Sequence, residues 1–335
     1  MKKVGIGVIS FAHLHGFSYI RCVAELPNAK LIAVADDDEA RGRKMAEQYS
    51  VPFYNDYNEL LKRDDIDGVI VTAENVKHAP IVVASAEAGK HILCEKPLAT
   101  RLEDADDMLR AVKRAGVKLQ TAYVMRYHTV TRFIKELLER GEIGKIVAMT
   151  GTNQIKWFLY GWFFEPDLSG GGAVMDHTVH LADLMRWYTK SEVRTVYTEI
   201  GKNIHSDVKV EDNALTLVTF ENGVIGSIDG SWSRPKPFYT WGGVAMEILG
   251  TEGIIQADAF RQNINVVESN PPNDRLEWHY WGCDTDKEMI KDFVDSILED
   301  REPRASGFDG RQGVEITLAA YESAKKGAEV TLPLK

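Results

Sequence analysis

The chain has 335 residues, which is long enough for two domains, and its 44% hydrophobic and 27% charged residues are an ordinary soluble composition. Forty Lys and Arg against 50 Asp and Glu give a net charge of −10 with no basic cluster, which argues against a nucleic-acid surface. No apolar run approaches the length of a membrane span, and the N-terminus reads as a strand instead of a signal peptide. Three widely spaced cysteines, Cys22, Cys94 and Cys283, favour a cytoplasmic protein over a disulfide scaffold.

Strand and helix patterns alternate over the first 120 residues, and this alternation predicts a parallel sheet covered on both faces. The predicted strands are residues 4–9, 31–35, 69–71, 92–94 and 118–120, with a further segment crossing the sheet from residue 51. The predicted helices run from the first turn to about residue 26 and over residues 39–49, 57–63, 79–88 and 102–115. We expect a dinucleotide-binding domain over residues 1–122.

The first turn carries the pattern Gly5-x-Gly7-x-x-Ser10. In dinucleotide-binding domains the first two glycines allow a tight turn and a close approach of the backbone to a pyrophosphate at the helix N-terminus. Ser10 replaces the usual third glycine. The position of the motif, after a strand and before a helix, indicates a dinucleotide site.

Acidic residues end the second strand, where the ribose hydroxyls of a dinucleotide lie in such domains. Asp36 stands at the strand end and Asp37 and Asp38 follow it. A carboxylate there repels a 2′-phosphate by about 4 kcal/mol at roughly 4 Å and an effective dielectric near 20. We therefore predict NAD over NADP. Arg41 and Arg43 either soften this preference or are solvated helix charges, and we favour the second interpretation.

Three further polar segments follow later strands, at the edge where open α/β sheets bind ligands. They are Thr72-Ala73-Glu74-Asn75 with His78, Glu95-Lys96-Pro97, and Tyr123-Val124-Met125-Arg126. A lysine held between a strand end and a proline has a fixed position, which a solvated lysine does not need. Lys96 is therefore a candidate functional residue.

After Tyr123 the pattern changes to long alternating segments, over residues 195–200, 214–220, 224–232 and 245–249. An Asn-Gly turn separates two of them and predicts a hairpin. A helix over residues 130–140 and a strand from residue 145 precede these segments, and a helical region over 307–328 and a strand near 330–332 follow them. Residues 123–335 thus predict a domain with an antiparallel sheet, helices on one side, and one face that the small residues from Gly226 to Ser231 leave thinly covered.

Three glycines, Gly170 to Gly172, precede an apolar run that ends near Tyr188. They predict a close-approach loop followed by a helix. On a uniform helix Asp176 and His180 share a face, with Asp183 one turn further on. An acid and a base on one face suit proton transfer, although an ordinary helix with a polar stripe has the same pattern.

Two further groupings have alternative interpretations. His13, His15, His177 and His180 with Asp176 and Asp183 suggest a metal, but His177 points about 100° from Asp176 on an ideal helix, and a metal needs converging ligands. We predict no metal. The aromatic-rich residues 157–164 are either core or oligomer contacts, or they border a sugar, whose C–H faces are apolar.

These motifs occur together in the order seen in one family. Gly5-x-Gly7-x-x-Ser10-x-x-His13, the acidic end of the second strand, Asn75-x-x-His78, Glu95-Lys96-Pro97 and the stretch from Gly170 to Asp183 resemble the Gfo/Idh/MocA family of glucose–fructose oxidoreductases and inositol 2-dehydrogenases. The similarity covers essentially the whole chain. Ser10, Ala73-Glu74 and Thr129 depart from the family pattern, and none of these departures removes a reacting group.

The resemblance implies an α/β Rossmann-type parallel sheet domain followed by an α+β domain with a large, mostly antiparallel open sheet. It implies an NAD-dependent oxidoreductase that transfers a hydride between nicotinamide and a secondary hydroxyl or ketone of a sugar, cyclitol or sugar derivative. A homodimer or homotetramer through the C-terminal sheet is expected, with a carbohydrate or polyol substrate and no nucleic-acid or membrane partner.

The resemblance also implies roles for individual residues. His180 is the general acid/base, Asp176 orients it, and Lys96 hydrogen-bonds the reacting oxygen. The expected cofactor contacts are Gly5, Gly7, Ser10, Phe11, His13, Asp36, Asp37, Thr72, Asn75, His78, Glu95 and Lys96. The expected substrate contacts are Tyr123, Arg126, Trp162 and His177. We expect Lys96 and His180 to meet beside the nicotinamide ring.

Two other functions use the same scaffold. Some relatives hydrolyse glycosides with NAD as a catalytic cofactor, and the same Lys, Asp and His would serve that reaction. A non-catalytic sensor is the second alternative, since folds are reused for binding alone. The presence of Lys96, Asp176 and His180 argues against a sensor.

Overall fold

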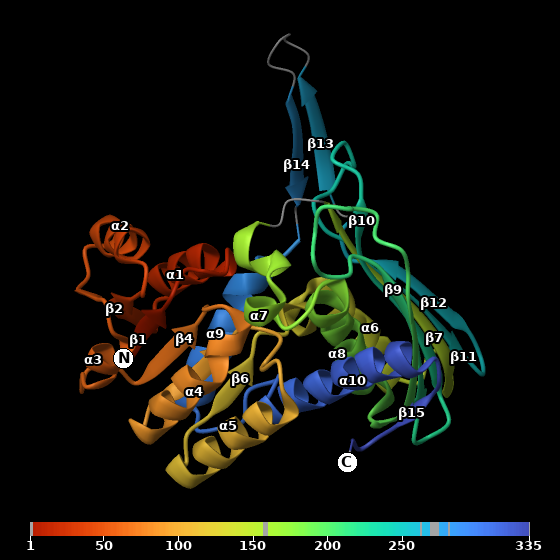
Figure 1. Cartoon of the computed structure of the whole chain (residues 1–335), viewed down its shortest axis with the longest axis horizontal. Helices are drawn as coiled ribbons and strands as arrows, with labels where there is room; N and C mark the ends of the chain where they lie inside the picture. Colours follow the sequence, from red (N-terminus) through yellow and green to blue (C-terminus); the bar gives the residue numbers. More distant parts are fainter. Residues whose placement is uncertain (1–2, 157–159, 262, 269–274, 281, 335) are drawn as a thin grey trace. The chain divides into compact units, whose positions relative to one another are not determined.

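The computed structural model describes all residues except 1–2, 157–159, 262, 269–274, 281 and 335 (Figure 1). The chain divides into two units. Unit 1 comprises Met1–Tyr127, Asp167–Gly170 and Thr285–Val314, and unit 2 comprises His128–Pro166, Gly171–Asp284 and Glu315–Lys335. Among the described residues, no helix has both the length and the apolar character that a bilayer crossing requires.

Unit 1 is built on a six-stranded parallel sheet with the order β3-β2-β1-β4-β5-β6. Its strands are β1 Val4–Ile9, β2 Ala29–Ala35, β3 Phe53–Tyr54, β4 Gly68–Val71, β5 His91–Cys94 and β6 Leu119–Thr121. Its helices are α1 His15–Glu25, α2 Glu39–Tyr49, α3 Tyr57–Leu61, α4 His78–Glu87, α5 Leu102–Ala115 and α9 Thr285–Leu298, with short 3-10 turns η1 Asn75–Lys77 and η2 Val124–Tyr127. This strand order is that of dinucleotide-binding sheets, so the predicted α/β class is confirmed.

Burial explains why these strands are nearly continuous apolar runs. Every residue of β1 and β4 is buried, as expected for parallel strands with helices on both faces. Figure 1 shows α4 and α5 packed side by side in this unit. Helix α9, which the sequence analysis missed, packs against α1 and β1 from a position late in the chain. Its Phe293 ring lies where a side chain at Gly68 would project.

Unit 2 contains a seven-stranded sheet with the order β12-β11-β7-β10-β9-β8-β15, whose neighbours are antiparallel except for the parallel pair β7 and β10. The strands are β7 Ile146–Lys156, β8 Val193–Ile200, β9 Ala214–Phe220, β10 Ile225–Arg234, β11 Val244–Gly250, β12 Ile254–Asp258 and β15 Val330–Thr331, and β13 Asn263–Glu268 pairs separately with β14 Arg275–Tyr280. The helices are α6 Thr129–Glu139, α8 Val179–Thr189 and α10 Gly307–Lys326, whose first residues belong to unit 1, with short turns η3 Gly161–Phe164 and η4 Val174–Thr178. The short helix α7 Pro166–Ser169 lies in unit 1 except for its first residue. The predicted mostly antiparallel sheet is confirmed.

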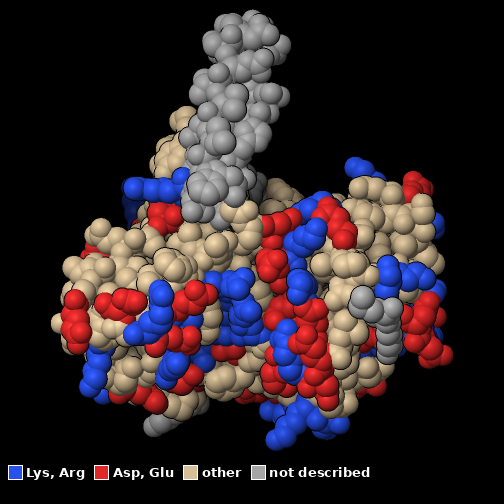
Figure 2. Space-filling model, turned by 180° about the vertical axis from the view of Figure 1, so that it is seen from behind, with Lys and Arg blue, Asp and Glu red and all other residues tan. Residues whose placement is uncertain are grey.

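Helix α8 covers one face of this sheet along β7 and β10 (Figure 1). Glycines permit this close contact. A side chain at Gly151 would meet Leu181, and one at Gly226 would lie 2.9 Å from the sulfur of Met185. The small residue Gly226 of β10 therefore lies on the sheet face that α8 covers. Figure 2 shows acidic and basic side chains interspersed over the face that it draws.

Candidate functional site

The first turn of unit 1 differs from its prediction. Gly5 and Gly7 lie inside β1, so the expectation that they form the tight turn is wrong. They are glycines because the core leaves no space: a Cβ at Gly5 would lie 2.0 Å from the carbonyl oxygen of Asp65, and one at Gly7 would lie 2.9 Å from Leu60. The turn begins at Ser10, which has the positive φ of 69° that a glycine usually supplies.

Hydrogen bonds between the ends of β1 and β4 hold this turn. The Thr72 hydroxyl donates to the Ser10 carbonyl over 2.6 Å, and the His13 amide donates to the Thr72 carbonyl over 2.9 Å. The Ser10 hydroxyl accepts from the Ala12 amide. A Cβ at Gly16, in the first turn of α1, would lie 2.7 Å from the Thr72 hydroxyl oxygen. The helix N-terminus is therefore packed closely against the sheet edge that binds ligands in folds of this kind.

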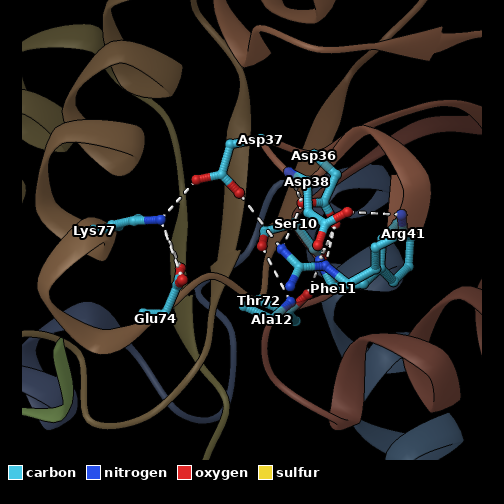
Figure 3. Close-up of polar contacts among 10 residues, drawn as sticks. All are labelled: Ser10, Phe11, Ala12, Asp36, Asp37, Asp38, Arg41, Thr72, Glu74 and Lys77. Atoms are coloured by element: carbon cyan, nitrogen blue, oxygen red, sulfur yellow. Dashed lines mark hydrogen bonds and ion pairs between the residues drawn. The ribbon is translucent and has the colours of Figure 1, made fainter. Parts of the chain in front are cut away.

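Asp36 follows β2 and is buried within a chain of charged groups (Figure 3). Its carboxylate accepts hydrogen bonds from the Phe11 amide at 2.9 Å and the Asp38 amide at 3.0 Å. Arg41 donates to it from Nε at 2.8 Å and from Nη2 at 2.6 Å. Arg41 is therefore not the solvated charge that the sequence analysis favoured, whereas the exposed Arg43 pairs with Glu39 one turn away as expected.

Asn75 and His78 follow β4, at the start of η1 and of α4. The Asn75 side-chain amide donates to the Ser169 carbonyl at 2.8 Å, and its buried Oδ1 accepts no hydrogen bond from the described residues. That acceptor suits a hydroxyl donor of a bound molecule. The ring nitrogens of His78 lie 2.9 Å from the Pro97 carbonyl and 3.1 Å from the Ala73 carbonyl, and burial lowers its pKa. His78 ties two strand ends together, and its cofactor contact stays a prediction.

Glu95 is the centre of a buried network after β5. It accepts hydrogen bonds from the Tyr19 hydroxyl at 2.5 Å and the Lys96 amide at 3.0 Å, and the His15 Nδ1 lies 2.9 Å away. Burial alone would raise the pKa of Glu95, but the neighbouring His13 and His15 hold it far below its ordinary value. Burial alone would likewise lower the pKa of His15, and the Glu95 carboxylate raises it. The network fixes the backbone that carries Lys96, which is itself buried.

The predicted substrate residues of unit 1 are also buried. The Arg126 guanidinium lies 2.9 Å from Asp309 and donates to the Arg304 carbonyl at 2.6 Å, so it ties η2 to the segment leading into α10. Tyr123 lies just before η2. In unit 2, Trp162 stacks on Phe163 with ring centroids 4.0 Å apart. Their substrate contacts stay predictions, and Trp157, Phe158 and Leu159 lie outside the described residues.

The glycine loop of unit 2 is packed against a carboxylate that the sequence analysis missed. Glu211 accepts from the amides of Gly172 and Val174, each at 3.0 Å, and from the Tyr321 hydroxyl at 2.7 Å. Burial raises the pKa of Glu211. A Cβ at Gly172 would lie 1.9 Å from the Glu211 carbonyl oxygen, and one at Gly171 would lie 2.0 Å from the Tyr321 hydroxyl. The prediction that the glycines allow a close approach of the backbone is confirmed. Steric contacts and the hydrogen bonds of Glu211 hold the loop.

The helix after this loop is not uniform. Val174–Thr178 forms a π turn, η4, before α8 begins at Val179, so the predicted continuous α-helix is wrong over its first turn. Asp176 and His180 therefore lie on opposite sides of a π–α junction, and the i, i+4 geometry of an α-helix does not apply to them. Both are buried, as is Asp183. π turns occur frequently at functional sites.

Asp176 is held by two aromatic side chains. The Trp232 Nε1–H donates to Asp176 Oδ2 at 3.1 Å, and His177 Nε2 lies 3.1 Å from the same oxygen. His177 Nδ1 lies 2.9 Å from the Asn153 carbonyl, so acceptors face both of its ring nitrogens. A uniform helix predicts no contact between Asp176 and His177. The sequence analysis included Trp232 only as the last residue of an alternating segment and missed this contact. The need of a buried Trp for a partner to its N–H is the signal that could have indicated it.

One cluster of possible metal ligands occurs among the described residues. His13, His15 and Glu95 each bring a ligand atom within 4.8 Å of the others. This set differs from the histidines considered from the sequence, since His177 and His180 do not belong to it. The His15–Glu95 ion pair and the hydrogen bonds of Glu95 account for its arrangement.

Comparisons with known proteins agree with this geometry. Residues 4–123 match the family model described as an oxidoreductase family with an NAD-binding Rossmann fold, and residues 131–256 match the GFO/IDH/MocA C-terminal domain. The chain belongs to the GFO/IDH/MocA family. As a member of that family it is an NAD-binding oxidoreductase.

Relatives with known names cover nearly the whole chain. The myo-inositol 2-dehydrogenase of Thermotoga maritima is 29% identical over 98% of this chain and 97% of its own length. The structure of GenD2 from gentamicin A biosynthesis in complex with NAD has a TM-score of 0.91 at 25% identity, covering 100% of this chain and 97% of that one. Levoglucosan dehydrogenase, in complex with NADH and levoglucosan, has a TM-score of 0.85 at 25% identity, covering 99% and 100%.

The residues of unit 1 fit the NAD that this family binds. A buried carboxylate follows β2, a helix N-terminus faces the edge after β1, and a buried amide oxygen after β4 has no donor among the described residues. These groups correspond to the ribose, pyrophosphate and further hydroxyl contacts of a dinucleotide. The predicted cofactor, NAD, is therefore supported, while the individual contacts stay predictions.

Proposed function

We propose that this protein oxidises a secondary hydroxyl of a sugar, cyclitol or sugar derivative with NAD, or reduces the matching ketone. The observation that carries the proposal is the buried Glu95 network, which fixes Lys96 at the ligand-binding edge of a dinucleotide-binding sheet. The relatives named as myo-inositol and levoglucosan dehydrogenases support the substrate class.

Bound NAD supplies the hydride acceptor, so the protein must orient the alcohol and manage its proton. We assign Lys96 to the reacting oxygen, where its ammonium stabilises the negative charge that develops as the proton leaves. We assign His180 as the base that takes this proton and Asp176 as the group that orients it. The Trp232 and His177 contacts hold Asp176 in one position.

A substrate screen tests this function. Purified protein is mixed with NAD and a panel of free sugars, inositols and glycosides, and NADH formation is followed at 340 nm while products are separated by chromatography. Steady NADH production from a free sugar or inositol is the expected result. Glycoside cleavage without net NADH would contradict the dehydrogenase and favour hydrolysis. No turnover of any compound, with NADH still bound, would favour a sensor.

The outer face of the seven-stranded sheet supports a homo-oligomer. While α8 covers the inner face, the outer face exposes Leu215, Leu217, Ile225 and Ile254, each more than half accessible. One row of paired residues crosses five neighbouring strands. It runs from Thr219 on β9 through Ile225 on β10, Ala148 on β7 and Leu249 on β11 to Ile254 on β12. Exposed apolar patches of this kind mark interaction surfaces. We propose that two copies pair through this face.

Gel filtration with light scattering tests the pairing. Leu217→Lys places a charge in the middle of the face and is expected to yield monomers, while Leu298→Lys on α9 in unit 1 is the control, since that side chain is also exposed. A monomeric wild-type protein, or an unchanged oligomer in Leu217→Lys, would contradict the proposal. We further propose a cytoplasmic location, which the three free cysteines support.

A further inference from the structure

The charged chain at the end of β2 bears on which dinucleotides the protein accepts. We propose that its ribose site takes NADP as well as NAD, and that Arg41 determines this tolerance. The inference rests on the dinucleotide site of the proposed function and on none of its catalytic roles. Every group involved belongs to unit 1 (Figure 3).

The hydrogen bonds that Asp36 already accepts leave no position for a ribose hydroxyl. A carboxylate has about four lone-pair positions for hydrogen bonds. The Phe11 amide and Arg41 Nε occupy Oδ2, and the Asp38 amide and Arg41 Nη2 occupy Oδ1. Asp36 is therefore filled, and a ribose hydroxyl reaches it only where Arg41 withdraws. The usual reason for NAD selectivity, a bare carboxylate beside the 2′ position, does not apply to this arrangement.

The Arg41–Asp36 ion pair changes the charge that a 2′-phosphate would meet. A bare carboxylate about 4 Å from a 2′-phosphate would disfavour NADP by about a thousandfold at an effective dielectric near 20. Arg41 forms a two-point ion pair with Asp36, and the charges of this pair largely cancel at the distance of a ligand. Its Nη2 also lies 3.4 Å from Asp37. The repulsion predicted from the sequence is therefore greatly reduced.

Arg41 and Lys77 offer N–H donors to a phosphate beside Asp37. Arg41 carries five N–H groups, of which those on Nη1 donate to no described residue, and its side chain is 27% exposed. Lys77 extends the chain on the other side: its ammonium lies 2.6 Å from Asp37 and 3.1 Å from Glu74. Two cations thus flank Asp37, and a guanidinium is well suited to phosphate. This set fits a 2′-phosphate.

Equilibrium binding tests the inference without any substrate. The full chain is titrated with NADH and with NADPH, and bound nicotinamide is read by its fluorescence. Adenosine 2′,5′-bisphosphate and AMP serve as competitors that isolate the 2′-phosphate. We expect the wild-type dissociation constants for NADH and NADPH to lie within about tenfold of one another, because Arg41 and Lys77 offset part of the negative charge of the carboxylates at the site.

Two variants and a control assign the effect. Arg41→Gln removes the cation and frees Asp36, so NADPH affinity is expected to fall by about a hundredfold or more while NADH affinity holds or improves. Lys77→Gln is expected to weaken NADPH by about tenfold and leave NADH unchanged. Arg43→Gln is the matched control, since Arg43 lies two residues from Arg41 on α2 and pairs instead with Glu39. It should alter neither affinity.

The outcomes separate this inference from the proposed function. A wild-type preference for NADH of a thousandfold, or an equal loss of both dinucleotides in folded Arg41→Gln, would overturn the role of Arg41. If Arg41→Gln does not fold, the more exposed Lys77 decides: a loss confined to NADPH in Lys77→Gln supports the site, and an unchanged NADPH affinity overturns it. Failure of the wild type to bind either dinucleotide would contradict the proposed function as well.

Discussion

The two units hold their functional side chains by different means. In unit 1, carboxylates at strand ends pair with cations and backbone amides, as Asp36 does with Arg41 and Glu95 with His15. In unit 2, the helix entrance is held by close backbone packing: Gly172 lies against Glu211, and Gly230 lies against His177 and Thr178. Ion pairs respond to pH and to charged ligands, whereas steric packing does not. The strand-end ion pairs of unit 1 are therefore expected to respond to pH and to charged ligands more than the glycine contacts of unit 2 do.

The largest expected effect comes from removing the proposed reacting groups on either side. Lys96→Met and His180→Asn should each lower turnover by about a thousandfold or more, because each removes charge or proton handling in the transition state. NADH affinity, measured by fluorescence, should change by less than about threefold in His180→Asn, since His180 is not among the expected cofactor contacts. Lys113→Met, on the exposed face of α5, is the control. Full activity in either site variant would remove that residue from the mechanism.

Steric packing in unit 2 should give the next largest effect. A methyl group at Gly172 would lie 1.9 Å from the Glu211 carbonyl oxygen, so Gly172→Ala should cost about 3 kcal/mol of unfolding free energy. Because no titrating group is removed, the loss should be equal at pH 6 and pH 9 in urea melts. Gly253→Ala, where the nearest atom would lie at 3.2 Å, should cost far less. Equal losses in the two variants would show that close approach does not explain Gly172.

A smaller effect is expected from the hydrogen bond that orients Asp176. Trp232→Phe keeps the ring but removes the N–H donor, which should cost about 1–2 kcal/mol of stability. Turnover should fall about tenfold at unchanged NADH affinity, since one of the groups holding the carboxylate is lost. Trp241→Phe is the control, because Trp241 is nearly half exposed. A turnover equal to that of the wild type would mean that Trp232 has a packing role alone.

The smallest expected effect is a pH dependence of stability, which tests the ion pairs of unit 1. The pKa of His15 is raised by Glu95, so its charge stabilises the fold fully below the ordinary histidine pKa of about 6.5 and less as pH rises through the folded value. His15→Gln should therefore destabilise by about 1 kcal/mol more at pH 6 than at pH 9. Thermal melts of both proteins at the two values measure this difference. The reverse sign would contradict the ion pair.

Local patterns in the sequence determined much of unit 1. The alternation of apolar strands and amphipathic helices predicted the parallel sheet, and the residue at each strand end followed from it, because the ends of parallel strands meet at one edge. Asp36, Thr72, Asn75 and Lys96 all stand at that edge or next to it. In unit 2 the same patterns predicted most strands and the position of the glycine loop.

Tertiary structure alone decided which neighbours these residues have. The contacts of Gly5 with Asp65, of Gly172 with Glu211, and of α9 with the first sheet join segments that are distant in the chain, where periodicity carries no information. The π turn at η4 and the pairing of Asp36 with Arg41 likewise depend on packing and on competing hydrogen bonds. The sequence determines which polar groups the chain contains. Their partners are determined by the tertiary structure, because the free energy of a buried polar group depends on the groups that surround it.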